Sequence, residues 1–294
     1  MKELRGTGVA LVTPFHKDLS VDFDGLTRLI EHCIAGGINY LVALGTTAET
    51  ATLTIKEKQQ IVAHIIKVTN KRLPIVLGVG GNNTAAIVEE LTTGNFDGIT
   101  AILSVSPAYN KPTQEGIYQH FAAISAASPL PIILYNVPGR TSSNMLPVTS
   151  ARLAGDFENI VAIKEAVNDM AQVLHLIHKV PEDFVVLSGD DALALPLVSA
   201  GGSGVISVIG QGLPSYFSQI MNDGLNNAFA KAYQKHLPLL SMIDLIFEEG
   251  NPAGIKSLLS HQGICEPYVR LPLMAASDVL HEKIGNALSV IQKS

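Results

Sequence analysis

A single lysine, Lys164, follows the apolar run Val161-Ala162-Ile163 and precedes Glu165. Short apolar runs of this kind are typical of strands buried in a parallel sheet. An ammonium group partly removed from water loses stability relative to the free amine, and a free amine is a nucleophile that forms a Schiff base with a carbonyl compound. The alternative is a strand-end lysine that extends to water or pairs with Glu165, and the segment alone favours this alternative.

Polar residues that follow other apolar runs favour the interpretation of Lys164 as a catalytic residue. Gly45-Thr46-Thr47 offers backbone N–H groups and two hydroxyls, which suit a carboxylate, although Gly-Thr turns are common. Tyr135 ends another apolar run and is a candidate to relay protons to and from a carbinolamine on Lys164. Arg140 is a candidate bidentate anchor for a carboxylate. Each has an ordinary alternative: Tyr135 as a packed core ring and Arg140 as a solvated loop cation. Together with Lys164, they favour an active site.

Two further motifs do not favour a site. Gly201-Gly202-Ser203-Gly204 is similar in composition to a phosphate-binding loop, but it precedes an apolar run, so we interpret it as a tight helix-to-strand turn. His175 and His178 are three residues apart on an expected helix, and no third metal ligand is evident in the sequence. We therefore expect a solvated helix face and no metal.

Apolar or β-branched runs alternate with helical patterns through the first two thirds of the chain. Eight such units favour an α/β fold, a closed (β/α)8 TIM barrel, over an open doubly wound sheet, which usually has a glycine-rich turn after its first strand. Thr13-Pro14-Phe15 occupies that place here. The expected strands are 8–12, 40–44, 75–79, 99–103, 132–135, 161–164, 185–188 and 205–208; the clearest expected helices are 24–35, 55–69, 84–93, 114–126 and 170–180.

Strand patterns stop near residue 225, and helical patterns cover 226–249 and 278–292. We expect residues 1–224 to form the catalytic barrel and 225–294 a C-terminal helical extension. We expect this extension to supply no catalytic group and to serve oligomer contacts; the alternative is that it is simply the closing barrel helix with extra packing surface.

Composition excludes several classes of protein. Of the 294 residues, 47% are hydrophobic and 16% charged, which is typical of a compact soluble enzyme. The net charge of −6, without a basic run, argues against nucleic-acid binding. No stretch approaches the roughly 20 apolar residues of a membrane span. The two cysteines form no C-x-x-C pair, and the N-terminal apolar stretch is too short for a signal peptide, so we expect a cytoplasmic protein.

Several motifs in order resemble those of the dihydrodipicolinate synthase family, within the pyruvate-dependent class I aldolase superfamily that also contains N-acetylneuraminate lyase. The resemblance runs essentially from end to end. The motifs are 6–15, Gly45-Thr46-Thr47-Ala48-Glu49, Tyr109-Asn110-Lys111-Pro112, Tyr135-Asn136-Val137-Pro138-Gly139-Arg140-Thr141, Ile163-Lys164-Glu165, Ser188-Gly189-Asp190-Asp191, Gly204-Val205-Ile206-Ser207 and Asn251-Pro252.

The resemblance implies catalytic roles for four residues. Lys164 would form the Schiff base with pyruvate. Thr46, Tyr135 and Tyr109 would form a proton relay, with Tyr109 contributed across a subunit interface.

The resemblance also implies a substrate site. Thr46 and Thr47 would bind the pyruvate carboxylate, and Gly189 and Ile206 would line the pyruvate site through backbone groups. Arg140 would hold the carboxylate of L-aspartate 4-semialdehyde; the family's sugar-acid lyase relatives differ at this position.

The implied activity is the synthase reaction of the diaminopimelate and lysine pathway, without metal or organic cofactor, in a homotetramer built as a dimer of dimers. Two alternatives stay open: an aldolase or lyase acting on another 2-oxo acid, and a catalytically silent barrel with a binding role. The arginine favours the synthase, and the intact set of lysine, tyrosines and threonine argues against a silent barrel.

Lysine-inhibited members of the family build an effector pocket from histidine, glutamate and tyrosine side chains. This chain has Ile55, Lys58, Ala86 and Ala108 at the corresponding positions. We therefore expect little or no feedback inhibition by L-lysine, although Thr50, Ala51 and Asn82 are compatible with a weak site.

Overall fold

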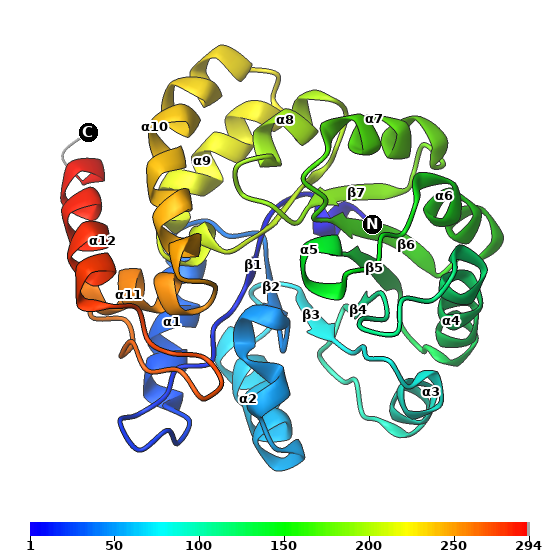
Figure 1. Ribbon diagram of the computed structural model, residues 1–294, viewed down its shortest axis with the longest axis horizontal. Coiled ribbons are helices and arrows are strands. Elements are labelled where there is room, and N and C mark those ends of the chain that lie inside the picture. The colour runs from blue at the N-terminus through cyan, green and yellow to red at the C-terminus, as the bar shows by residue number, and fades with distance from the viewer. Residues whose placement is uncertain (293–294) are drawn as a thin grey trace.

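Eight short parallel strands pair in chain order and close into a barrel, because the last strand pairs with the first. The computed structural model describes residues 1–292, and Figure 1 shows helices arranged around the strands. This architecture confirms the predicted (β/α)8 barrel, with every strand within two residues of its expected bounds. The strands are β1 (Gly6–Ala10), β2 (Tyr40–Ala43), β3 (Ile75–Gly78), β4 (Ala101–Val105), β5 (Ile132–Asn136), β6 (Ile160–Glu165), β7 (Val185–Ser188) and β8 (Gly204–Ser207).

Several helices begin where a side chain accepts a backbone N–H of the first turn. Asp22, Thr54, Asn83, Thr113 and Asp169 fill this capping position. The helices are α1 (Phe23–Ala35), α2 (Ile55–Thr69), α3 (Thr84–Thr93), α4 (Gln114–Ala127), α5 (Pro138–Thr141), α6 (Pro147–Asp156), α7 (Met170–Lys179), α8 (Ala194–Ser199), α9 (Pro214–Leu225), α10 (Phe229–Glu248), α11 (Ala253–His261) and α12 (Asp278–Ile291); short 3₁₀ turns are η1 (Lys2–Leu4), η2 (Thr46–Ala48), η3 (Thr50–Thr52) and η4 (Ile209–Gln211).

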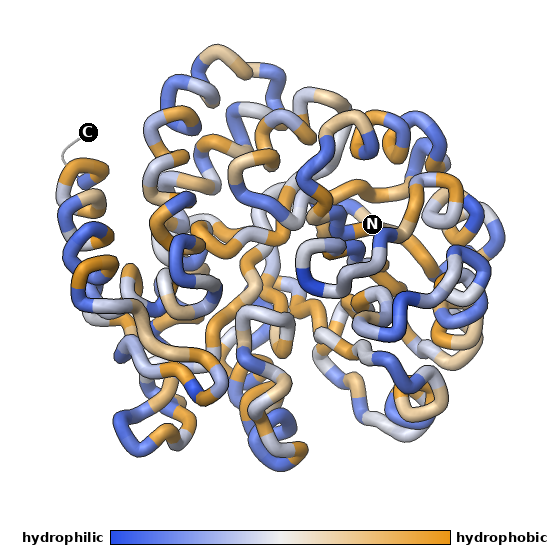
Figure 2. The backbone as a smooth tube through the Cα atoms, viewed as in Figure 1, coloured by the Kyte–Doolittle hydropathy of each residue, from blue (hydrophilic) through white to orange (hydrophobic). Residues whose placement is uncertain are grey.

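Successive strand residues point to opposite sides, so the barrel has two hydrophobic layers. One layer fills the barrel interior and includes Tyr40, Ile133, Tyr135 and Ile206. The other lies between the strands and the surrounding helices. Figure 2 shows the strands as mainly hydrophobic and the outer helices as mixed, as expected for strands buried on both faces.

The barrel floor is filled by Tyr40, which is fully buried and donates its hydroxyl hydrogen to the carbonyl oxygen of Val205 at 3.1 Å. Gly8 lies opposite, and a Cβ there would be 2.1 Å from the Tyr40 ring. The glycine is therefore needed to make room for this ring.

The Gly201-Gly202-Ser203-Gly204 segment joins α8 to β8, which confirms the predicted helix-to-strand turn. Gly201 (φ +108°) and Gly204 (φ +150°) lie in the part of backbone space that favours glycine.

The helices after residue 225 pack against the barrel at one side of the molecule in Figure 1. Leu239, Ile255, Leu258 and Leu280 belong to the same hydrophobic layer as residues of the strands and of α1. The division at residues 224 and 225 stays a proposal; the hydrophobic core is continuous across it.

Within residues 1–292, no helix combines the length and apolar character that crossing a bilayer requires.

Candidate active site

Lys164 and Tyr135 lie side by side at the carboxyl ends of β6 and β5, where they are register partners. Both point into the barrel, because Ala162 and Ile133, two residues earlier on each strand, belong to the interior layer. Lys164 is 6% exposed, and its Nζ lies 4.3 Å from the centre of the Tyr135 ring. A nearly buried amine therefore faces an aromatic side chain at the active end of the barrel.

Glu165 does not pair with Lys164, because adjacent strand residues point to opposite sides. Its carboxylate lies outside the barrel and accepts hydrogen bonds from Asn136 Nδ2 (2.9 and 3.0 Å) and the Val167 backbone N–H (2.9 Å). Among the described residues, Lys164 forms no ion pair with a carboxylate. The interpretation of Lys164 as a solvated or Glu165-paired lysine is therefore wrong.

Asn136 and Glu165 connect the two strands immediately beyond the pair of Tyr135 and Lys164. They are register partners, and both side chains are buried. Asn136 also accepts from the Met145 N–H at 2.9 Å, which ties β5 to the segment after α5. These hydrogen bonds fix the strand ends that carry the lysine and the tyrosine.

Gly189 follows β7 and lies directly against Lys164. A Cβ at Gly189 would be 3.0 Å from Lys164 Cε and 2.7 Å from the Ala166 Cβ. Ile206 on β8 is 1% exposed and belongs to the same interior layer as Tyr135. The structure thus brings Gly189 and Tyr135 to Lys164 and places Ile206 in the same barrel lumen.

Thr46 and Thr47 begin the 3₁₀ turn η2, which is separated from the end of β2 by Leu44 and Gly45. Thr46 is exposed, whereas Thr47 is 3% exposed and its Oγ1 accepts a hydrogen bond from Asn251 Nδ2 at 2.9 Å. As the first residues of a turn, their N–H groups have no partner inside it. This arrangement leaves two N–H donors and the Thr46 hydroxyl for an anion.

Tyr109 and Arg140 lie on neighbouring loops at the same end of the barrel. The Tyr109 N–H donates to the carbonyl oxygen of Thr141 at 3.2 Å, next to Arg140. Tyr109 has a left-handed backbone (φ +66°), and its side chain is 90% exposed. Arg140 is also exposed, and it forms no ion pair within residues 1–292. Neither side chain forms a side-chain hydrogen bond or ion pair with another of the described residues.

The two aspartates after Gly189 have different surroundings. Asp191 is buried, and its carboxylate accepts from the N–H groups of Val208 and Ile209 (3.0 and 2.8 Å), which ties the loop after β8 to the loop after β7. Burial raises the pKa of Asp191 to about 6. Asp191 therefore supports the backbone next to Ile206.

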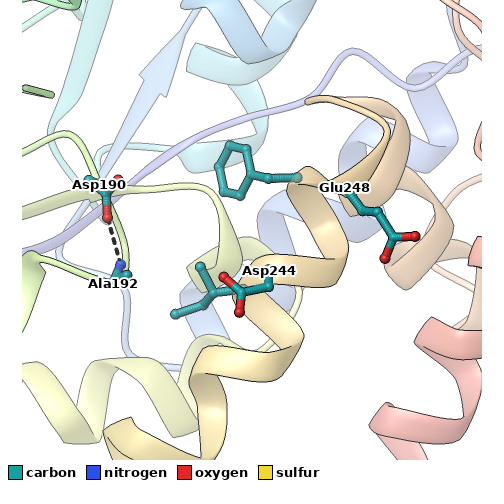
Figure 3. Close-up of a pocket in the computed structure, with 6 residues that line it drawn as sticks. Asp190, Ala192, Asp244 and Glu248 are labelled. Atoms are coloured by element: carbon teal, nitrogen blue, oxygen red, sulfur yellow. Dashed lines mark hydrogen bonds between the residues drawn. The ribbon is translucent and has the colours of Figure 1, made fainter. Parts of the chain in front are cut away.

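Asp190 lies at the edge of a cavity of about 290 Å³ between this loop and α10. Figure 3 shows Asp190 accepting the Ala192 N–H, with Asp244 and Glu248 projecting from α10. Ile243 and Phe247 complete the lining. Lys164 does not line this cavity, so the cavity is separate from the interior candidate site.

The part of the chain that the structure describes contains no group of three or more His, Cys, Asp or Glu side chains placed to hold a metal. His175 and His178 are both exposed on α7. The predicted solvated helix face is confirmed.

Three supporting residues were not predicted from the sequence: Asn136, Glu165 and Asn251. All three belong to motifs noted above, but sequence patterns do not show that their side chains bond across elements. The expectation that the C-terminal extension serves oligomer contacts omits its contact with Thr47, which arises because residue 251 folds back onto the loop after β2.

Stability should depend on pH through Glu165, because burial raises the pKa of its carboxyl group from 4.5 to about 7. The folded chain then binds a proton more tightly than the unfolded chain, so this stabilisation is complete below pH 4.5 and is lost as the pH rises through about 7. In Glu165→Gln, the fall in free energy of unfolding between pH 5 and 8, measured by urea titration, should shrink by on the order of 2 kcal/mol. Asp191 titrates in both proteins and serves as an internal control. An unchanged pH dependence in the variant would contradict this account of Glu165.

Comparison with known proteins identifies the family of the chain. The model of the "Dihydrodipicolinate synthetase family" matches residues 3–291. The 4-hydroxy-tetrahydrodipicolinate synthase of Flavobacterium psychrophilum is 55% identical over 293 residues, covering 100% of this chain and 99% of the relative. That of Parabacteroides distasonis is 49% identical over 285 residues, covering 97% and 96%.

A solved structure agrees with the fold over nearly its whole length. The chloride-inhibited dihydrodipicolinate synthase from Acinetobacter baumannii, complexed with pyruvate, superposes with a TM-score of 0.95 at 39% identity and covers 98% of this chain and 99% of that chain. Fold, motifs and full-length similarity agree, and this chain belongs to the dihydrodipicolinate synthetase family.

Proposed function

We propose that this chain condenses pyruvate with L-aspartate 4-semialdehyde to form 4-hydroxy-tetrahydrodipicolinate in the diaminopimelate and lysine pathway. The observation that carries the proposal is the position of Lys164: nearly buried at the active end of the barrel, beside Tyr135, and without a carboxylate partner among residues 1–292. The full-length similarity to proteins named as this synthase favours it over an aldolase for another 2-oxo acid. The arrangement of Lys164 and Tyr135 argues against a silent barrel.

In the proposed reaction, Lys164 Nζ attacks C2 of pyruvate, and the resulting carbinolamine loses water to give an imine. Loss of a proton from C3 gives an enamine, which attacks the aldehyde carbon of the second substrate. The amino group of that substrate then attacks C2, closes the ring and displaces the lysine nitrogen. These steps need no metal or organic cofactor.

Proton transfers are assigned to Tyr135, Thr46 and Tyr109. Tyr135 lies against the amine, so its hydroxyl is the candidate to exchange a proton with the carbinolamine. Thr46 and Tyr109 would connect Tyr135 to solvent. Because Tyr109 is 90% exposed, we propose that it completes the site of a neighbouring subunit.

Substrate recognition is assigned to the loops around the lysine. Thr46 and Thr47 would bind the pyruvate carboxylate, while the backbone at Gly189 and Ile206 would line its site. The exposed Arg140 would bind the carboxylate of the semialdehyde through two parallel hydrogen bonds.

We also propose a cytoplasmic homotetramer, a dimer of dimers, in which residues 1–224 and 225–294 act as barrel and helical extension. Exposed Ile55 (76%) and Tyr109 (90%) support an interface at the ends of the loops after β2 and β4.

Treatment of the enzyme with borohydride in the presence of pyruvate should inactivate it and add a reduced pyruvyl group to Lys164, because borohydride reduces the imine to a stable amine. Peptide mass spectrometry identifies the labelled lysine. Lys256 is an internal control, since it is also buried but is paired with Glu49. Lys164→Ala should stay folded and unlabelled, because alanine at a strand end leaves no charge unpaired. Labelling at another lysine would contradict the assignment.

Arg140→Ala should lower kcat/KM for L-aspartate 4-semialdehyde by roughly 10- to 150-fold, because it removes a charge-assisted hydrogen bond worth about 1.5 to 3 kcal/mol. Trapping of pyruvate on Lys164 should persist. Arg152→Ala is the control, since Arg152 is an exposed arginine paired with Glu115 on the outer helices. Equal losses of trapping and turnover would show that Arg140 organises the whole site instead.

L-lysine should inhibit the enzyme little or not at all, because a ligand ammonium group would find Lys58 and no acidic partner at the positions named above. The side chain of Asn82 is already bonded to the Ala108 backbone through its oxygen and its nitrogen, both at 2.8 Å. A steady-state titration with L-lysine, with D-lysine as the ionic control, checks this expectation. Strong inhibition at submillimolar L-lysine would overturn it.

A further inference from the structure

The C-terminal region reaches back to the loop that carries Thr46 and Thr47. Asn251, between α10 and α11, donates from Nδ2 to Thr47 Oγ1 at 2.9 Å, and both residues are buried. This hydrogen bond spans 204 positions of the chain. The orientation of the Thr47 side chain is therefore set by a residue outside the strand segments of the barrel.

A buried ion pair fixes the same loop two residues further on. Glu49 and Lys256 have side chains that are 0% exposed, and Lys256 Nζ lies 2.6 Å from Glu49 Oε1. The other carboxylate oxygen accepts the Arg270 N–H at 2.8 Å, and Lys256 also donates to the Tyr268 carbonyl oxygen at 2.7 Å. A buried ion pair is stable only when additional hydrogen bonds satisfy both charges, and here they do.

An aromatic ring completes this contact. Phe15, which follows β1, has Lys256 Nζ 4.2 Å from its ring centre and the Arg270 guanidinium 4.4 Å from it. Arg270 also pairs with Glu57 at the start of α2. The loops that follow β1 and β2 are thus held against α11 and the segment after it.

The backbone of this loop needs such support. Glu49 has a left-handed conformation (φ +55°), which is unfavourable for a residue with a side chain. Thr13 Oγ1 donates to the Ala48 carbonyl oxygen at 2.7 Å from the barrel side. Lys256 and Asn251 hold the opposite side, so the loop is fixed between β1 and the C-terminal helices.

We propose that Asn251 and Lys256 are positioning residues that hold the Thr46–Thr47 turn in the geometry needed to bind the pyruvate carboxylate. This inference rests on the proposed function. Both residues are bonded to the loop itself: Asn251 Nδ2 donates to Thr47 Oγ1, and the fully buried Lys256 ammonium donates to Glu49 and the Tyr268 carbonyl oxygen. Asn251 contacts Thr47 and Lys256 contacts Glu49, so their loss displaces the carboxylate-binding part of the turn first and weakens pyruvate binding more than it slows the proton transfers assigned to Thr46.

The test compares Asn251→Ala with Ser257→Ala. Ser257 is buried in α11, close to Asn251 in the sequence. Its Oγ forms a hydrogen bond with His281 Nδ1 at 2.8 Å and not with the Thr46–Thr47 turn. The KM for pyruvate in Asn251→Ala should rise about tenfold or more, with kcat within about threefold of wild type, because small displacements of a binding group have effects of this size. Ser257→Ala should lower the melting temperature without changing the KM for pyruvate.

Lys256→Met alone leaves Glu49 buried and unpaired and is prone to unfold. The double variant Glu49→Gln with Lys256→Met removes both charges and keeps an acceptor for the Arg270 N–H. It should fold and show a raised pyruvate KM. The concentration of pyruvate that gives half-maximal borohydride trapping on Lys164 should rise in parallel in both test variants.

The outcomes separate this inference from the proposed function. Trapping in the wild type combined with an unchanged pyruvate KM in both test variants would overturn the positioning role alone. An equal rise in KM in Ser257→Ala would overturn it too, because general loss of stability would then explain the effect. Absence of trapping in the wild type would overturn the proposed function and this inference with it.

Discussion

The register of β5 and β6 is the constraint on which the site depends. It places Tyr135 beside Lys164 and, because strand side chains alternate, directs both into the barrel while Asn136 and Glu165 point outward. A shift of one residue would bring the glutamate inside and turn the lysine toward the helices. The outward pair of Asn136 and Glu165 makes two hydrogen bonds across the same strands, so the outer face stabilises the arrangement that the inner face uses.

Around this pair, the active-end loops after β1, β2, β7 and β8 are fixed by buried polar groups. Asp191 binds the N–H groups after β8, and Gln211 binds both the Val12 N–H and the Ala10 carbonyl oxygen at the end of β1. Glu49 is held by Lys256. Loops that were free to move would have to be ordered by the substrate, at a cost in binding free energy. The tied loops are those of Thr46, Gly189 and Ile206, whereas Tyr109 and Arg140 remain exposed.

The fold was predictable because each strand is a short apolar run and each helix has a periodic pattern with capping residues, such as Thr54 before α2. The candidate site was predictable in part: a lysine in an apolar strand is unusual, and Tyr135 ends the apolar run of the preceding strand. Its support was not, because Asn251 and Thr47 are far apart in sequence, and hydrophobic patterns do not report hydrogen bonds between side chains. The pairing of Glu165 with Asn136 rather than Lys164 follows from strand alternation and could have been deduced from the sequence.

The central claim is that Lys164 binds pyruvate covalently at the end of β6 while the turn after β2 binds its carboxylate. A crystal structure of the chain soaked with pyruvate tests both parts at once. We expect continuous density from Lys164 Nζ to C2 of pyruvate, with the carboxylate against the N–H groups of Thr46 and Thr47. Pyruvate bound without a covalent bond to Lys164, or with its carboxylate on a different loop, would contradict it.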